Sequence, residues 1–98
     1  MAVFLAEIEL FNSGSEDFLE RIPAQRRVVN ELMAEGVIVS YAVAADRKKM
    51  WCFLEAENEQ DATLAIESFP LHMFMETVLH PLLFHNTHAA LMGSISLN

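Results

Sequence analysis

The sequence has little of what builds several common kinds of site. Its 98 residues include one cysteine and three glycines, which excludes an internal disulfide and leaves no multi-cysteine metal pattern or glycine-rich phosphate loop. Only six residues are Lys or Arg, against 14 Asp or Glu, for a net charge of −8. Because phosphate binding needs clustered positive charge, this balance predicts no nucleic-acid partner. The bases at 26–27 and 47–49 are interpreted as solvated surface.

Long apolar runs and targeting signals are also missing. No run approaches the ~20 residues that cross a bilayer, and the opening segment MAVFLAEIEL has no basic flank and no cleavage site of a signal peptide. These absences predict a cytoplasmic protein with no membrane partner. The single cysteine, Cys52, lies between Trp51 and Phe53. It is predicted to be a buried apolar residue rather than a nucleophile.

Apolar residues, in contrast, are abundant. They make up 53% of the chain, yet a domain of this length buries only ~60–70% of the surface that its unfolded chain exposes. This is more apolar side chain than one small core readily hides. The composition therefore predicts that the protein pairs with another copy of itself.

Alternation and helical periodicity predict the element order β-α-β-β-α-β. Ser15 and Asn58 are the expected N-caps of the two helices, and Gly36 is the expected end of the first. Pro23 is expected to kink the first helix or to begin a second segment, and Pro81 restricts the last strand to an edge or a bulge. The expected strands are 2–11, 37–45, 50–57 and 73–85, with helices at 16–35 and between residues 58 and 70.

This order, with two right-handed crossovers around a hairpin, predicts a ferredoxin-like α+β fold. Its four-stranded antiparallel sheet carries both helices on one face, in one domain spanning residues 1–87. The strands are apolar on both faces, whereas a sheet covered on one side normally alternates. We therefore expect the second face to pack on a second subunit, as a homodimer or a larger homo-oligomer. The apolar tail, 88–98, is expected at an intersubunit contact.

Two segments lie near the end of the domain, FPLHMFM at 69–75 and PLLFH at 81–85, at a fixed distance in the sequence after Glu35 and Gly36. With that spacing, residues 3–87 resemble the muconolactone Δ-isomerase family. The resemblance implies a dimeric α+β barrel, often assembled into larger rings, and lactone isomerisation without a cofactor.

The chain departs from this family at positions where the family carries basic or aromatic residues. Leu5 and Glu7 occupy the positions of a His and a Lys in the first strand, while Glu55 matches an acid of the third. Because muconolactone is an anion that a site should meet with positive charge, we expect a different substrate. The matching positions of the second strand, rich in Arg, His and Trp in the family, are Val39, Ser40, Ala42 and Val43.

Two carboxylates are the candidate catalytic groups. Alternation places Glu7 and Glu55 on the same face as Trp51, on strands that this topology makes neighbours, so the acids are expected to approach one another. An apolar setting and a second carboxylate raise a carboxyl pKa, which suits proton transfer beside a carbonyl. The alternative is that acids on these strands are solvated and have no catalytic role. We favour this alternative for Glu9 and Glu57, which lie at the ends of their strands.

The candidate ligand-binding residues are two aromatics and two histidines. Tyr41 and Trp51 are able to orient a ligand through their hydroxyl and indole N–H, although packing in an interface is the favoured explanation of both. His72 and His80 are candidates for binding or for acid catalysis. The histidine spacing fits no metal-ligand pattern on a strand or a helix, so no metal and no cofactor is predicted.

Two main functions follow. The first is a cofactor-independent, isomerase-like enzyme that transfers protons on a small, mostly apolar carbonyl or lactone compound, bound between helices and sheet or inside an intersubunit barrel. The alternative is a non-catalytic module of the same fold for small-molecule binding or oligomerisation. A third, a barrel that handles haem or oxygen, has only the analogy of fold behind it.

Overall fold

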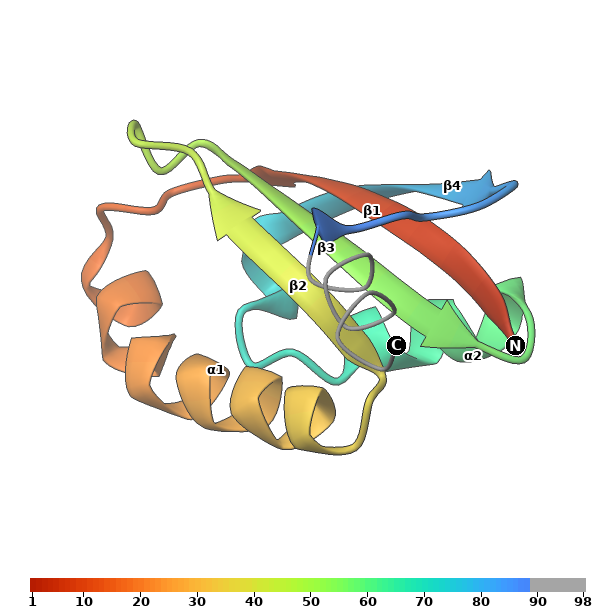
Figure 1. Cartoon of the computed structure of the whole chain (residues 1–98). Coiled ribbons are helices and arrows are strands. Elements are labelled where there is room, and N and C mark those ends of the chain that lie inside the picture. The colour runs from red at the N-terminus through yellow and green to blue at the C-terminus, as the bar shows by residue number, and fades with distance from the viewer. Residues whose placement is uncertain (89–98) are drawn as a thin grey trace.

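The computed structural model describes residues 1–88, in which two helices lie on one face of a four-stranded antiparallel sheet (Figure 1). The strand order is β2-β3-β1-β4. The strands are β1 (Ala2–Leu10), β2 (Ile38–Val43), β3 (Lys49–Ala56) and β4 (Met75–Leu82). The helices are α1 (Glu16–Ala34) and α2 (Glu59–Glu67), and a short 3-10 helix, η1 (His72–Phe74), precedes β4. The predicted element order and ferredoxin-like fold are confirmed.

Side-chain caps begin both α-helices where the sequence predicted them. The Ser15 hydroxyl accepts a hydrogen bond from the Phe18 N–H at 3.2 Å. The Asn58 side-chain oxygen accepts one from the Asp61 N–H at 2.8 Å. Each bond satisfies a backbone donor that the helix itself leaves without a partner.

The end of α1 is set by Gly36, which has a positive φ of 79°. Its neighbour Val37 donates its N–H to the Leu32 carbonyl at 2.9 Å, the bond that closes a helix ending in a left-handed glycine. The helix continues through Pro23 as one element. The alternative of a second segment starting at Pro23 is therefore wrong.

The core fills the space between the helices and the sheet. In it α1 lies against β2, and α2 lies against β3 and β4. Cys52 is fully buried, as predicted, and burial raises the pKa of its thiol to about 12. The buried core cluster is Phe4, Ala6, Ile8, Val29, Ile38, Met50, Cys52, Leu54, Ala56, Ala62, Ile66 and Phe69.

The last strand is shorter than predicted because residues 72–74 form η1. Pro81 lies in β4, an edge strand, as a residue without a backbone N–H requires. Among residues 1–88, no helix is both long and apolar enough to cross a membrane. The predicted contact of the tail falls mainly on residues 89–98, outside the described part of the chain.

The second face of the sheet, here called the open face, carries neither α1 nor α2 (Figure 1). Within the described chain, the His85 ring stacks on Phe53 with ring centres 4.2 Å apart, so the segment after β4 covers part of it. The strand registers assign to the open face Val3, Leu5, Glu7, Glu9, Ser40, Ala42, Lys49, Trp51, Phe53, Glu55, Glu76, Val78, His80 and Leu82.

Candidate functional site

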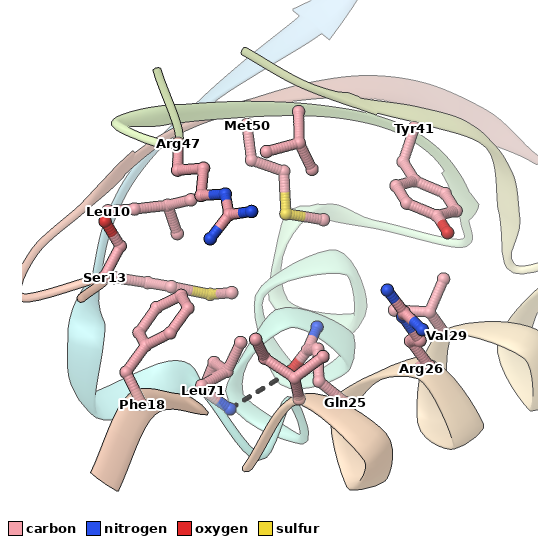
Figure 2. Close-up of a pocket in the computed structure, with 13 residues that line it drawn as sticks. Leu10, Ser13, Phe18, Gln25, Arg26, Val29, Tyr41, Arg47, Met50 and Leu71 are labelled. Atoms are coloured by element: carbon pink, nitrogen blue, oxygen red, sulfur yellow. Dashed lines mark hydrogen bonds between the residues drawn. The ribbon is translucent and has the colours of Figure 1, made fainter. Parts of the chain in front are cut away.

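A cavity of about 350 Å³ lies between α1 and the covered face of the sheet (Figure 2). Its volume falls in the range of small-molecule pockets. The apolar lining is Leu10, Phe18, Ile22, Val29, Val43, Met50, Leu71 and Met75. The polar lining is Ser13, Gln25, Arg26, Tyr41 and Arg47.

A bulge in β2 decides which of its residues face this cavity. The pairing with β3 shifts register between Ile38 and Ser40, which leaves Val39 as an extra residue. Because successive strand residues point to opposite faces, one extra residue moves the rest of the strand to the other side. Tyr41 therefore faces α1 and lines the cavity. The expectation that Tyr41 and Trp51 share one pocket is wrong, because they lie on opposite faces.

Gln25 of α1 places an unpaired hydrogen-bond donor at this cavity. The residue is only 8% exposed, and its side-chain oxygen accepts the Leu71 N–H at 3.1 Å. Since a backbone N–H can only donate, the oxygen must face Leu71 and the amide nitrogen must point away. That nitrogen, Nε2, has no hydrogen-bond partner among the described residues, and Figure 2 shows it directed into the cavity. A buried donor without a partner costs about 1–3 kcal/mol.

Two arginines bring positive charge to the cavity from opposite sides. Arg47 lies in the turn between β2 and β3, where its φ of 63° is in the left-handed region and the Lys48 N–H donates to the Asp46 side chain at 2.9 Å. Its guanidinium reaches into the space between sheet and helix (Figure 2). Arg26 extends from α1 on the side of the Tyr41 hydroxyl (Figure 2). Neither guanidinium forms an ion pair within residues 1–88.

The cavity is therefore lined by donors and cations in a protein of net charge −8. No Asp or Glu is among its lining residues. Such a lining suits a compact, largely apolar molecule that carries acceptor oxygens or negative charge. Arg26 and Arg47 are exposed, as their interpretation as solvated surface predicted, and they also line the cavity.

The sequence contains a signal for this site that apolar periodicity alone misses. Ile22 and Val29 belong to the apolar stripe of α1, and Gln25 and Arg26 occupy the intervening positions of the same stripe, at i+3 and i+4. A polar pair where helical spacing calls for apolar residues indicates either a pocket or a strained core. The structure shows a pocket.

The predicted acid Glu7 lies on the open face, away from the cavity. Its two oxygens contact Lys49 Nζ at 3.0 Å and His80 Nε2 at 3.2 Å. The hydrogen bond from Lys49, followed by that from His80, lowers the pKa of the Glu7 carboxyl below its ordinary value. The expected upward shift of the Glu7 pKa is therefore wrong, because the hydrogen bonds from Lys49 and His80 outweigh desolvation. His80 is brought to Glu7, as a pairing that the sequence did not predict.

Glu55 does not approach Glu7. In the pairing of β1 with β3, Glu55 lies opposite Val3, whereas Glu7 lies opposite Trp51. Four strand positions separate the two acids, roughly 13 Å along the sheet. The expected carboxylate pair is not formed.

The remaining predicted residues lie apart from the cavity. Trp51 is half-buried beside Glu7 on the open face. His72 is exposed at the start of η1 and lines a separate hollow of about 330 Å³ beside α2 and β4. Of the six predicted site residues, only Tyr41 lines the cavity. Within residues 1–88, no three His, Cys, Asp or Glu side chains are grouped as metal ligands would be.

Comparison with known proteins shows a similarity in fold. No family model matches the chain, and no curated protein matches it. One solved structure that is similar is the 5-chloro-2-hydroxyhydroquinone dehydrochlorinase of Burkholderia phenoliruptrix AC1100, in complex with 2,5-dihydroxybenzoquinone. The TM-score is 0.69 at 15% identity, over 88% of this chain and 97% of the other. The two chains share a fold.

Proposed function

We propose that this protein is a cofactor-independent enzyme of small-molecule metabolism that moves a proton beside the carbonyl group of a small ring compound. The site is the cavity between α1 and the sheet, and the substrate class is a lactone, quinone or related compound with an acidic or anionic oxygen. The activity resembles that of the muconolactone Δ-isomerase family. The substrate itself is expected to be different.

The observation that carries this proposal is the free Nε2 donor of Gln25 at an apolar cavity. When a proton leaves the carbon beside a carbonyl, negative charge develops on the carbonyl oxygen. A fixed donor in a water-poor site stabilises that charge more than the neutral substrate. The guanidinium of Arg47, directed into the same space, supplies further stabilisation.

Tyr41 is the proposed proton-transfer group. Its hydroxyl oxygen accepts the proton from the carbon beside the carbonyl while its own hydroxyl proton passes to a different carbon of the conjugated system. The double bond moves, the hydroxyl is regenerated, and no atom is gained or lost. Arg26, on the same side of the cavity, stabilises negative charge on the tyrosine oxygen or on a ligand beside it.

Two further observations support a small-molecule site. The cavity volume of about 350 Å³ accommodates one or two rings with substituents. The structural neighbour is an enzyme whose complex contains a quinone with two acidic hydroxyls, the type of ligand that a lining of donors and cations suits.

The first test measures binding of 2,5-dihydroxybenzoquinone by titration calorimetry. The variant Gln25→Glu keeps an oxygen for the Leu71 N–H but loses the donor, and we expect its affinity to fall at least ~tenfold. The matched control is Gln60→Glu, the same change on the exposed surface of α2, which should bind as the wild type does. Equal affinities for the two variants would remove the proposed site.

A second candidate function is binding without catalysis. It is favoured by the lining itself, which contains no carboxylate and no imidazole among the described residues. Proton NMR in deuterium oxide separates the two functions. The enzyme exchanges the ring proton of an unsaturated γ-lactone and moves its double bond, and Tyr41→Phe stops the exchange while binding stays within about threefold. A wild type that binds the quinone but exchanges no proton is a binding module.

A further inference from the structure

A second hollow, here called the α2 hollow, lies in the same layer as the cavity, between the helices and the sheet. It has a volume of about 330 Å³ and lies beside α2 and β4. The residues of β4 that line it pair with Leu10, Ile8 and Ala6, whose side chains belong to the core under the helices. The lining of the α2 hollow is Glu59, Thr63, Ile66, Glu67, His72, Met75, Thr77 and Leu79.

Met75 is common to the cavity and the α2 hollow. It lines both spaces, and no other lining residue is shared between them. Leu71 lines the cavity, whereas the next residue, His72, lines the α2 hollow. The segment that leads into β4 therefore runs between the two spaces, and the half-buried Met75 side chain lies where they adjoin.

The backbone of this segment is held by the rest of the chain. The Leu71 N–H donates to the Gln25 side chain at 3.1 Å, and the Phe74 carbonyl accepts the Phe11 N–H at 2.8 Å. The separation of the two spaces therefore depends on the Met75 side chain, an unbranched thioether that adapts its shape to its surroundings. Removing that side chain should join the two spaces while the backbone stays in place.

The two spaces have opposite charge. The cavity is lined by Arg26 and Arg47 and by no acid. The α2 hollow is lined by Glu59 and Glu67 and by no Lys or Arg. It also contains the buried Ile66. A negatively charged group gains nothing in the α2 hollow, so the part of a ligand that fits there is an uncharged apolar chain.

We propose that Met75 limits the length of the ligand, by confining a ring compound to the cavity and closing the α2 hollow to any apolar chain attached to that ring. This inference rests on the proposed small-molecule site, although on no particular reaction there. A methylene group that moves from water into an apolar space raises affinity about fourfold. A chain that Met75 keeps out of the α2 hollow remains in water and adds little.

Titration calorimetry with 2,5-dihydroxybenzoquinone and its 3-hexyl derivative tests the limit. In the wild type, the hexyl chain should change the affinity by less than about threefold. In Met75→Ala, the hexyl derivative should bind at least about tenfold more tightly than the parent quinone. A wild type that already gains tenfold from the chain, or a Met75→Ala variant that gains no more than the wild type, overturns the proposal.

Two further variants keep this test decisive. Met73→Ala is the matched control, because Met73 belongs to the same segment, is 61% exposed and lines neither space. Its preference for the hexyl derivative should equal that of the wild type, and a gain as large as that of Met75→Ala contradicts the role of Met75. Met75→Val removes less of the side chain and should give an intermediate gain, which tests the proposal if circular dichroism shows that Met75→Ala does not fold.

The outcome also separates this inference from the proposed function. If the wild type does not bind the parent quinone, the proposed site is wrong and the limit at Met75 is wrong with it. If the wild type binds the parent quinone but Met75→Ala has the same preference for the chain, only the limit at Met75 is wrong.

A charge at the end of the chain shows which space the chain occupies. An ammonium group that reaches the α2 hollow meets Glu59 and Glu67, which repel a carboxylate, whereas Arg26 and Arg47 at the cavity have the opposite preference. The preference for an ammonium-ended over a carboxylate-ended hexyl chain should therefore be at least about tenfold larger in Met75→Ala than in the wild type. An equal preference in the two proteins means that the chain does not enter the α2 hollow, which overturns the proposal.

Discussion

The two faces of the sheet are built from the same four strands but handle polar groups in opposite ways. On the covered face, Gln25 lies against an apolar hollow with its amide nitrogen unpaired. On the open face, Glu7 has both oxygens bonded to neighbours of its own chain. An unmet donor favours a ligand that meets it, whereas a satisfied carboxylate gains little from one. Satisfaction of hydrogen bonds therefore separates the candidate site from the candidate interface better than residue type does.

The acids that attract attention in the sequence, together with Trp51, lie on the open face, whereas the polar lining of the cavity includes an amide, a phenol and two guanidinium groups. A carboxylate is conspicuous in an apolar strand, and an amide in a helix is not. Three experiments test this difference between the two faces.

The largest expected effect compares adjacent residues of β3. Leu54 is fully buried on the covered face, so Leu54→Ala should reduce the free energy of unfolding by about 3 kcal/mol. Phe53 is half-buried on the open face, and Phe53→Ala should cost about 1 kcal/mol in the isolated chain. Urea unfolding at two protein concentrations measures both. If a second copy covers Phe53, its deficit grows with concentration while that of Leu54 stays constant.

A smaller effect is expected at the turn between β2 and β3. Arg47→Ala removes a charge that points into the cavity, and the affinity for 2,5-dihydroxybenzoquinone should fall about tenfold, equivalent to about 1.4 kcal/mol. Lys48→Ala removes the same charge from the next residue, which is exposed and does not line the cavity. Titration calorimetry should show no loss for Lys48→Ala. Equal losses would mean that only long-range charge matters.

The smallest effect is the pH dependence of the Glu7 cluster. Because its partners lower the pKa of Glu7 below the ordinary value of 4.5, the stability it contributes is present above that pH and is lost as pH falls through the folded-state pKa. Glu7 in turn raises the pKa of Lys49 above 10.5, so the Lys49 contribution is present below that pH and is lost on further titration with base.

Thermal unfolding at a series of pH values measures this window. The difference in melting temperature between wild type and Glu7→Gln should be present between about pH 5 and pH 10 and shrink outside it. The exposed acid Glu57, with no ion pair among the described residues, supplies the control variant Glu57→Gln. If the difference in melting temperature between wild type and Glu7→Gln does not change with pH, the Glu7–Lys49–His80 cluster does not contribute the proposed stability.

The fold was predictable because its signals are local. Caps at Ser15 and Asn58, the positive φ of Gly36 and alternation in β1 and β3 each act within a few residues, and they agree with one another. Even the place of Pro81 on an edge strand follows from its missing N–H.

The site was predicted less well because it depends on register and on side-chain partners. Alternation places Glu7 and Glu55 on one face correctly, but the offset between strands, which separates them, is fixed by pairing across the sheet. The bulge at Val39 has no signature in the residues around it, yet it decides where Tyr41 points. The direction of the Glu7 pKa shift required Lys49 and His80, whose proximity no spacing rule gives.

The bulge at Val39 also decides which side chains of β2 line the cavity. Regular pairing beyond Ile38, with Val39 kept and paired instead of bulged, would turn Ala42 and Ala44 toward α1 in place of Tyr41 and Val43. The pocket would lose its hydroxyl and widen, with Ile38, Leu54 and the rest of the core left in place. Related chains in which this strand pairs without the bulge are therefore expected to share a scaffold and to differ in the molecules they accept.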